Sequence, residues 1–439
     1  MNQKTIAVIG AGPAGLFAAK TLAENNIRVC LFNRDVRPGG LAEYGIYPEK
    51  YILKAGLRRQ FLSFLEHENI SYFGNVEIGD GKDFSLSQLQ TMGFNGILVT
   101  AGAQKIKKLD LEGETIPRVY HAWEIVSKYN ELPPYSQMEY PIGKKVVIVG
   151  VGNVMADIAR YLLHKDGVEE ILAVARRGPA EIKFHQTEFA HIAQNLDRAD
   201  FEKEMERVTP LMLKLGQDPN DTWAFIEKAC ENCEDTRSKT NLRLRFLKSP
   251  TRFLGNETDG LQGVEFIENT LIEENHSTKT IATSLKTIFD ADTAILAVGS
   301  SVDDEIGLPV KKYEFTVSPY PDYPQDGISF ELFDPQTQKN IPGIFVAGWS
   351  RLASYGLVGI SGKDGVKGAQ AVLEYLQDHG KPLDWEELEL QIRHSKKMVI
   401  DKKMVGNLLS IEAKIAEREG LAEYKFPTNQ EMLTAIGIC

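Results

Sequence analysis

The sequence predicts an α/β protein that contains two doubly wound parallel sheets. Two glycine-rich turns, at residues 10–15 and 150–156, each follow a short apolar run and precede a helical stretch. An apolar run that ends in small residues recurs at 96–103 (GILVTAGA) and 294–301 (AILAVGSS), which supplies a late strand for each sheet. At 439 residues the chain is longer than one hydrophobic core usually supports, so we expect two or three domains.

The first glycine-rich turn lies in a strand–helix–strand unit near the N-terminus. Residues 5–9 (TIAVI) have the length and composition of a buried strand, and a helix to about Asn25 and a strand at 28–32 come next. In the pattern G-x-G-x-x-G, glycines allow a tight turn and let the backbone approach a pyrophosphate at the helix N-terminus. The candidate contacts in this turn are Gly10, Gly12, Pro13, Ala14 and Gly15.

The second glycine-rich turn has the same plan but a different strand end. The run at 145–149 (KVVIV) predicts its first strand, and the pattern G-x-G-x-x-A begins at Gly150. A strand at 171–175 ends in Arg176 and Arg177, where an NAD site would place a carboxylate. Guanidinium groups hold a ribose 2′-phosphate, so we predict NADP(H) here, which leaves FAD for the first unit. The alternative is a tight turn followed by ordinary surface arginines.

Three features bear on a flavin site. Asn33 stands at a strand end where a carboxylate usually binds the adenosine ribose, and its side-chain oxygen can accept one hydrogen bond. The adjacent Gly39 and Gly40 would let the backbone approach a flat ligand such as a flavin, although a simple turn explains them equally well. The turn at 356–359 and the helix after it present N–H groups that suit the negative charge of a reduced flavin.

The remaining segments are assigned by pattern alone. Residues 197–240 are polar and charge-rich with helical periodicity, and we interpret them as an insertion in the second domain. Residues 243–290 alternate apolar and polar positions, which predicts a meander of antiparallel strands. A strand is expected at 342–349, a helix from about Asp364 to Leu376, and further charged helices in roughly the last 60 residues.

Composition and charge argue against several classes of protein. The net charge of −11 disfavours nucleic acids and membrane surfaces as partners, and no apolar run approaches the ~18 residues of a membrane span. Because the chain starts a strand almost at once, we expect no signal peptide and a cytoplasmic protein.

Cysteine usage points to no metal site. The four cysteines, Cys30, Cys230, Cys233 and Cys439, are too few and too scattered for a disulfide framework or an iron–sulfur cluster. Cys230 and Cys233 form a C-x-x-C, which suits a redox pair or half a zinc site. We favour two ordinary thiols, because no second pair completes a metal site and no basic residue adjoins them.

Five motifs occur in an order that spans nearly the whole chain: GAGPAGL (10–16), PGGLAEYGIYP (38–48), VVIVGVGNVMADIARYLL (146–163), ARRGP followed by F and E (175–188), and GIFVAGW with YGLVGI (343–360). In these motifs the chain resembles the adrenodoxin reductase family of ferredoxin–NADP(+) reductases. The resemblance implies two Rossmann-like domains: an FAD domain split in sequence (1–105 and 335–439) and an inserted NADP(H) domain (106–334). It also implies hydride transfer from NADPH to FAD, then release of single electrons to a ferredoxin-like or other iron–sulfur carrier.

Carried over by position, the resemblance also assigns residues. Glu188 matches a family acid near the nicotinamide, and Trp349 would lie along the reacting rings, so both are candidate catalytic residues. Gly40 and Leu41 would face the flavin. The other candidate cofactor contacts are Ala101, Gly102, Gly150, Gly152, Asn153, Val154, Arg176, Arg177, Gly348, Gly356, Leu357 and Val358, besides Asn33 and the residues of the first turn.

Departures from the family pattern indicate a divergent branch. Asn33 replaces the usual acid, Glu49-Lys50 replaces Asp-His, and residues 351–355 (RLASY) replace Lys-Arg-Gly-Pro-Thr. Rival interpretations are a protein like the glutamate synthase small subunit, a thiol-disulfide reductase that uses the C-x-x-C pair, and a non-catalytic FAD/NADP redox sensor.

An acidic electron carrier would need a basic face on this acidic chain. The candidates are Lys54, Arg58 and Arg59, and the run Arg393, Lys396, Lys397, Lys402 and Lys403, although each group is more simply a solvated helix face.

Overall fold

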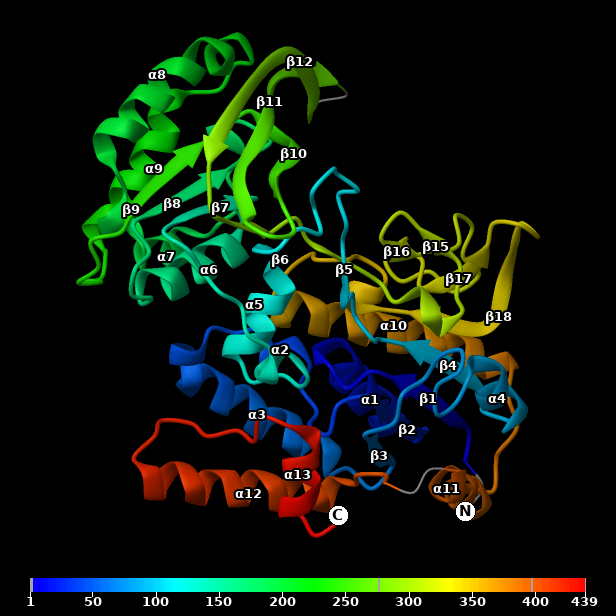
Figure 1. Cartoon of the computed structure of the whole chain (residues 1–439). Coiled ribbons are helices and arrows are strands. Elements are labelled where there is room, and N and C mark those ends of the chain that lie inside the picture. The colour runs from blue at the N-terminus through cyan, green and yellow to red at the C-terminus, as the bar shows by residue number, and fades with distance from the viewer. Residues whose placement is uncertain (1–2, 275–276, 396–397, 439) are drawn as a thin grey trace. The chain divides into compact units, whose positions relative to one another are not determined.

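The computed structural model describes residues 3–274, 277–395 and 398–438, and over these ranges the chain divides into two compact units (Figure 1). Unit 1 contains the chain up to Lys107, Ser127–Gln137, and the chain from Gly299 onward. Unit 2 contains Lys108–Val126 and Met138–Val298. Each unit has its own parallel sheet.

Unit 1 is built on a sheet in which the strands are ordered β17-β18-β4-β1-β2-β3. Neighbours are parallel from β18 to β3, and β17 is antiparallel to β18. Side chains of a strand alternate between faces, so Ile6 and Val8 enter one core while Ala7 and Ile9 enter another. The strands are β1 (Thr5–Ile9), β2 (Arg28–Asn33), β3 (Ile70–Gly74), β4 (Gly96–Val99), β17 (Glu331–Asp334) and β18 (Lys339–Val346).

Helices cover both faces of this sheet, as a mostly parallel sheet requires. The core with Ile6 receives side chains from α1 (Pro13–Glu24), α3 (Tyr51–Leu65), α10 (Val358–Asp378), α12 (Lys402–Glu419) and α13 (Asn429–Ala435). The core with Ala7 receives side chains from α4 (Leu86–Thr91) and α11 (Trp385–Ser395). Short elements complete the unit: α2 (Leu41–Tyr44), β5 (Lys105–Ile106), β14 (Ser300–Ser301), β15 (Val310–Lys311) and β16 (Glu314–Phe315).

Unit 2 contains a parallel sheet ordered β6-β13-β7-β8-β9 and an antiparallel sheet ordered β10-β11-β12. Val147, Leu172 and Phe266 share one core, which joins the two sheets face to face. The parallel strands are β6 (Val119–His121), β7 (Lys145–Val149), β8 (Glu170–Val174), β9 (Asn241–Arg245) and β13 (Thr293–Leu296). The antiparallel strands are β10 (Lys248–Asn256), β11 (Gly260–Glu274) and β12 (Ser277–Asp290), and the helices are α6 (Asn153–Leu163), α7 (Gln186–Ala190), α8 (Arg198–Lys214) and α9 (Pro219–Glu231). The helix α5 (Ala122–Tyr129) runs from unit 2 into unit 1.

Three sequence-based expectations need adjustment. Residues 197–240 form α8 and α9, but they are the crossover between the parallel neighbours β8 and β9 rather than an added insertion. The antiparallel meander covers β10 to β12, whereas β9 belongs to the parallel sheet. Residues 299–334, expected in the inserted domain, cluster with unit 1 because Val302 and Phe315 share a core with Val99.

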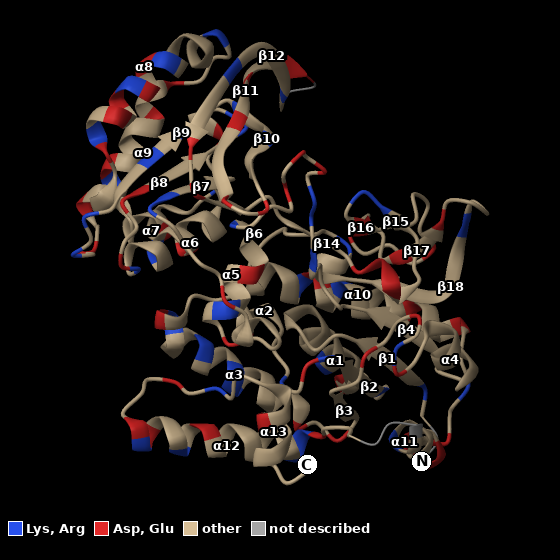
Figure 2. Ribbon diagram, viewed as in Figure 1, with Lys and Arg blue, Asp and Glu red and all other residues tan. Residues whose placement is uncertain are grey.

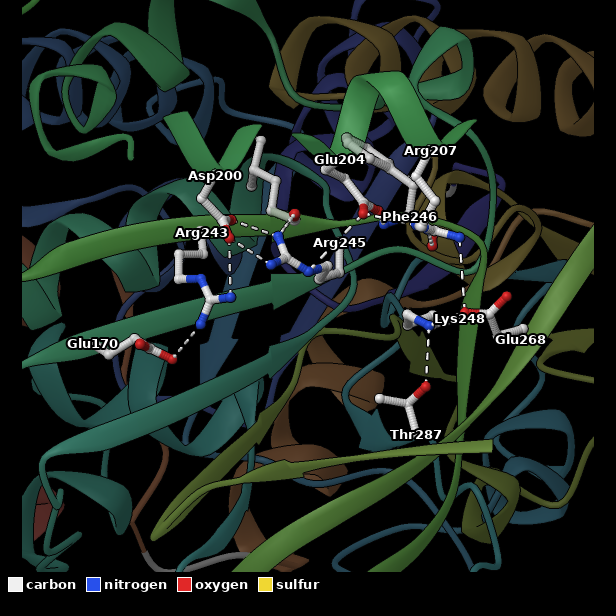
Figure 3. A network of polar contacts seen from close by, with 11 residues as sticks. Glu170, Asp200, Glu204, Arg207, Arg243, Arg245, Phe246, Lys248, Glu268 and Thr287 are labelled. Atoms are coloured by element: carbon white, nitrogen blue, oxygen red, sulfur yellow. Dashed lines mark hydrogen bonds and ion pairs between the residues drawn. The ribbon is translucent and has the colours of Figure 1, made fainter. Parts of the chain in front are cut away.

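A network of charged side chains holds α8 against the edge strand β9 (Figure 3). Arg243 and Arg245 point to the same side of β9, and both donate to Asp200 of α8. Arg243 makes one hydrogen bond of 3.0 Å, and Arg245 makes two, of 2.5 and 2.6 Å. One turn along α8, Glu204 accepts a hydrogen bond from the backbone N–H of Phe246 over 2.7 Å. Alternation along β9 explains the arrangement, because Leu242 and Leu244 beside these arginines are fully buried.

Positions of lysine and arginine alternate with positions of aspartate and glutamate along the ribbon of both units (Figure 2). The helices α8 and α12 each carry both signs of charge along their length. This distribution fits the moderate net charge of the sequence.

Candidate functional site

The glycine-rich turn of unit 1 has a geometry that demands glycine. Gly10 has φ +104°, and its N–H donates to the carbonyl of Phe32 over 2.8 Å. A Cβ atom here would lie 2.6 Å from the carbonyl oxygen of Thr100 and 2.7 Å from Ala101 Cα, which is too close for either atom. The turn therefore sits between the ends of β2 and β4. The helix α1 begins at Pro13, where the missing N–H removes no helical hydrogen bond.

The predicted contacts of unit 1 gather around the N-terminus of α1. Gly12 caps this helix without a side-chain hydrogen bond, and a Cβ on it would meet no described atom within 4 Å. A Cβ on Gly40 would lie 3.0 Å from Gly12 Cα, and one on Gly348 would lie 2.6 Å from Ala14 Cβ. Gly40 in turn caps α2, which begins at Leu41. Open space beside unpaired helix N–H groups is what a dinucleotide pyrophosphate requires, so these residues fit such a ligand.

Close packing brings the N-terminal part of α10 to the same place. A Cβ on Gly365 would overlap the carbonyl oxygen of Ala14, at 2.1 Å, so only glycine lets the two helices approach this closely. A Cβ on Gly15 would likewise lie 1.9 Å from the carbonyl oxygen of Gly10. The N–H of Gly102, after β4, donates to Ser350 Oγ over 2.9 Å. The ends of β4, α1 and α10 are thus held together by small residues.

The start of α10 presents the last group of predicted contacts. Gly356 precedes Leu357, which caps the helix without a side-chain hydrogen bond, and Val358 is its first residue. The indole Nε1 of Trp349 donates to the carbonyl of Tyr355 over 2.9 Å, which fixes the ring beside this turn. A helix of 21 residues directs a positive dipole end toward whatever lies there.

Asn33 is fully engaged within the protein. Its Oδ1 accepts a hydrogen bond from Ala11 N–H over 3.0 Å, and its Nδ2 donates to the carbonyls of Asp35 and Arg37, each over 2.9 Å. Only 7% of the residue is exposed. The amide therefore ties the glycine-rich turn to the loop that carries Gly39 and Gly40. Its expected contact with a ribose remains a prediction.

The glycine-rich turn of unit 2 repeats the geometry of the first. Gly150 has φ +115°, its N–H donates to the carbonyl of Val174 over 2.9 Å, and a Cβ would lie 2.3 Å from the carbonyl oxygen of Ala297. Gly152 caps α6 without a side-chain hydrogen bond, and a Cβ on it would meet no described atom within 4 Å. The residues thus fit a second dinucleotide.

The first residues of α6 differ in their surroundings. Asn153 Oδ1 accepts a hydrogen bond from His185 N–H over 2.7 Å, so this side chain holds the loop before α7. Val154 is an exposed apolar residue on the same turn. Exposure of a branched side chain at a helix N-terminus leaves it available to a ligand.

The arginine pair comes after β8 on a backbone that is fixed from two sides. The carbonyl of Arg177 accepts from Leu247 N–H over 3.1 Å, and the carbonyl of Arg176 accepts from Asn269 Nδ2 over 3.0 Å. The Arg176 side chain is exposed. The Arg177 side chain is partly exposed and contacts Glu181 and Thr278. Guanidinium groups presented at this strand end suit a 2′-phosphate.

The two candidate catalytic residues lie in different units. Glu188 is a partly buried residue of α7 in unit 2, and Trp349 belongs to unit 1. Each keeps its predicted role as a proposal.

Sequence reasoning missed a buried ion cluster in unit 1, formed by Arg37, Glu43, Lys54, Arg58, Glu412, Glu423 and Lys425. Arg58 makes two hydrogen bonds to Glu43, of 3.0 and 2.6 Å, and Lys425 Nζ lies 2.9 Å from Glu43 Oε1. Arg37 pairs with Glu412 of α12. The cluster holds the loop of Gly39 and Gly40 against the C-terminal part of the chain. No local sequence pattern predicts this cluster, because Arg37 and Glu412 are 375 residues apart.

Burial and charge act in opposite directions inside this cluster. Burial alone would raise the pKa of Glu43, but Lys425, Arg58 and Arg37 lower that pKa well below its ordinary value. Burial lowers the pKa of Lys425 to about 8, against the opposing effect of Glu43. The surrounding cations therefore favour the charged form of Glu43 despite its burial.

The predicted basic faces are mostly engaged elsewhere. Lys54 is only 1% exposed and donates to Glu423 Oε2 over 3.0 Å, so it is no surface residue. Lys402 donates to backbone carbonyls at the end of α3 and beyond it, including that of Leu65 over 3.0 Å. Arg393 pairs with Glu389. Arg59 and Lys403 are exposed, whereas Lys396 and Lys397 lie outside the described residues.

Other candidate chemistry is limited. Cys30 is buried, and Cys230 and Cys233, at the end of α9, are free thiols; Cys439 lies outside the described residues. Within the described ranges, no group of three or more His, Cys, Asp or Glu side chains is placed to bind a metal ion. Among the helices described, none has the length and hydropathy of a membrane span.

Comparisons with known proteins agree with this geometry. A family model described as pyridine nucleotide-disulphide oxidoreductase matches residues 4–200. A probable ferredoxin/ferredoxin–NADP reductase of Mycobacterium leprae is 27% identical over 401 residues, which cover 84% of this chain and 66% of that protein. The mitochondrial NADPH:adrenodoxin oxidoreductase of Arabidopsis thaliana is 26% identical over 389 residues, which cover 80% and 78%. The chain thus spans about two thirds of the length of the mycobacterial relative.

A solved structure shares the fold. Mycobacterium tuberculosis FprA, solved in complex with NADPH, superposes with a TM-score of 0.82 at 20% identity, and the match covers 99% of both chains. This confirms the predicted α/β class with parallel Rossmann-like sheets. The fold and the paired glycine turns are those of a protein with two Rossmann-like units. The chain is thus similar, over most of its length, to ferredoxin–NADP reductases and NADPH:adrenodoxin oxidoreductases.

Proposed function

We propose that this protein transfers hydride from NADPH to FAD and passes single electrons on to a ferredoxin-like iron–sulfur protein. One observation carries the proposal: two glycine turns share one geometry, but only in unit 2 does the next strand end in an arginine pair. A 2′-phosphate distinguishes NADP(H) from other dinucleotides, so unit 2 is assigned NADP(H) and unit 1 FAD. The names of the relatives, which specify ferredoxin and adrenodoxin, support an iron–sulfur partner.

In unit 1 the residues would bind and orient FAD. Gly10, Gly12 and the start of α1 would receive the pyrophosphate, and Gly40 with Leu41 would allow close approach of the ring. FAD, when bound, accepts two electrons as hydride and releases them singly. The N-terminus of α10, at Leu357 and Val358, would stabilise the negative charge that develops on reduction.

In unit 2 the residues would select and place the reductant. Gly150, Gly152 and Asn153 would receive the NADP pyrophosphate, while Arg176 and Arg177 would hold its 2′-phosphate. Glu188 is proposed to lie near the nicotinamide. In unit 1, Trp349, fixed by its hydrogen bond to the carbonyl of Tyr355, is proposed to lie along the reacting rings.

An anaerobic titration of the purified protein with NADPH and then NADH, followed in the flavin absorption band, tests the proposal. We expect a yellow protein whose flavin is bleached by NADPH at much lower concentration than by NADH. A yellow protein that NADPH does not bleach would instead favour a redox sensor. A colourless protein that cannot be reconstituted with FAD would refute the assignment of unit 1.

The thiol-disulfide alternative has a separate test. Replacing Cys230 and Cys233 together by Ser should leave NADPH-driven reduction of one-electron acceptors within about twofold of wild type, because neither proposed nucleotide site includes these residues. Loss of that activity would revive a dithiol mechanism.

A further inference from the structure

The arginine pair has an acidic neighbour that the NADP(H) assignment does not use. Glu181 ends a short helical turn, Pro179–Glu181, directly after the arginines. Its Oε1 lies 3.5 Å from Arg177 Nη1, and it accepts a hydrogen bond from Thr278 Oγ1. Thr278 Oγ1 itself accepts from Arg177 Nη1 over 3.2 Å. The three side chains form a closed triangle at the strand end.

The other carboxylate oxygen of Glu181 is a buried acceptor. Glu181 is 16% exposed at its side chain, yet Oε2 is inaccessible and has no hydrogen-bond donor among the described residues. Because a nucleotide cannot reach Oε2, Glu181 acts on a bound nucleotide through its charge and through Arg177.

The same carboxylate also weakens the attraction of Arg177 for phosphate. A 2′-phosphate must compete with Glu181 for the guanidinium and must approach a second negative charge. Arg177 is 39% exposed, so solvent and salt reduce the penalty without removing it. Of the pair, Arg176 is exposed and makes no ion pair within the described part of the chain.

We propose that Glu181 is a specificity-determining residue that makes the preference of this site for NADPH over NADH smaller than it would be without Glu181. It does so by occupying Arg177 and by placing a second negative charge beside the position proposed for the 2′-phosphate. The inference rests on the proposed NADP(H) site in unit 2, and it concerns how strongly that site discriminates.

Binding of nucleotide fragments tests this without relying on flavin chemistry. The dissociation constants of 2′,5′-ADP and 5′-AMP are measured by calorimetry for the wild type, Glu181→Gln and Glu181→Ala. Removing the charge should lower the dissociation constant of 2′,5′-ADP about 3- to 10-fold, the range of a partly exposed ion pair. The affinity for 5′-AMP should be unchanged or lower. Steady-state kcat/KM for NADPH relative to NADH should rise by a similar factor.

A matched control removes a carboxylate from the hairpin that carries Thr278. Glu274, at the end of β11, pairs with Lys279 rather than with an arginine of the site. Glu274→Gln should change the ratio of the two dissociation constants by less than about twofold, since exposed pairs contribute little. A change as large as that of Glu181→Gln would mean general electrostatics and would overturn the specific role.

Two further outcomes separate failure of the inference from failure of the site. If the wild type prefers 2′,5′-ADP and both Glu181 variants keep the same ratio or weaken it, Glu181 does not oppose phosphate and the inference is refuted, while the NADP(H) site stands. If neither the wild type nor Glu181→Gln prefers 2′,5′-ADP, the NADP(H) site itself is refuted, and the inference with it.

Discussion

The two glycine turns are nearly identical in backbone geometry, but the strand ends beside them are opposite in character. Gly10 and Gly150 have φ of +104° and +115°, and each is packed against a carbonyl of the neighbouring strand end. At the end of β2, Asn33 turns inward and binds the loop that leads to Gly40. After β8, in contrast, Arg176 and Arg177 present exposed side chains on a backbone held by hydrogen bonds.

This difference teaches that the turn and the strand end have separate roles. In the proposed function, the turn makes room for a pyrophosphate, which every dinucleotide has. The strand end is part of the scaffold in unit 1, whereas in unit 2 it is proposed to present charge to the ligand. On this proposal, selectivity for a nucleotide belongs to a few side chains and not to the fold.

The largest expected effect comes from breaking the shared turn. Gly150→Ala places a Cβ 2.3 Å from a carbonyl oxygen at a positive φ, so we expect unit 2 to lose ~3 kcal/mol or more of stability and NADPH binding with it. Gly152→Ala is the matched control, because its Cβ meets open space. Thermal unfolding should show little change in that variant; equal destabilisation of both would contradict the packing argument.

A carboxylate at the strand end of unit 1 should be harmful here, although related sites use one. Asn33→Asp replaces an amide donor that serves two carbonyls with a charged acceptor, so we expect ~2–3 kcal/mol of destabilisation and weaker flavin retention. Denaturant unfolding monitored by flavin release measures it. Asn75→Asp, which loses one exposed hydrogen bond to Met398, should cost under ~1 kcal/mol. Tighter flavin binding in Asn33→Asp would show that the side chain faces the ribose.

Replacing Arg177 by alanine should change the KM for NADPH but hardly that for NADH. Arg177→Ala is expected to raise the KM for NADPH about 10- to 100-fold and to change the KM for NADH little, because only NADPH carries the 2′-phosphate. Steady-state kinetics with both reductants provides the measurement. Equal changes for the two would refute the 2′-phosphate assignment.

The smallest expected effect is the loss of the stability contributed by Asp200 at low pH. Burial opposes ionisation of Asp200, but hydrogen bonds from Arg245 and Arg243 outweigh it and lower the pKa of this carboxyl to about 2. A depressed carboxylate contributes stability above its unfolded pKa and loses it as the pH falls toward 2. The difference in the free energy of unfolding between the wild type and Asp200→Asn should therefore decrease between about pH 4 and 2, by no more than ~1 kcal/mol. A constant difference would argue against the network in Figure 3.

Much of the fold was predictable from local signals. Short apolar runs and glycine spacing located β1, β7 and both turns. The arginines after β8 led to the prediction of NADP(H), which stays a prediction. The same logic gave the late strands β4 and β13, because each ends in small residues. Local geometry of this kind is encoded within about ten residues.

The rest depends on contacts that are distant in sequence. Lys54 looks like a surface residue of α3, but its carboxylate partner Glu423 is 369 residues away, so no local pattern reveals that it is buried. The role of Asn33 could not be predicted for a similar reason, since one partner is Tyr72 in β3. The crossover of α8 and α9 resembled an insertion because two parallel neighbours can be far apart in the chain.

The split of unit 1 in sequence has a consequence for synthesis on the ribosome. All of unit 2 is translated before β18 and α10, so the growing chain carries β4 as an open sheet edge while unit 2 already has all its strands. Open edges invite pairing with other chains. The ion cluster that holds the loop of Gly39 and Gly40 also needs Glu423 and Lys425, which are translated after β18 and α10. Unit 2 therefore has all its strands before the sheet and the ion cluster of unit 1 are complete.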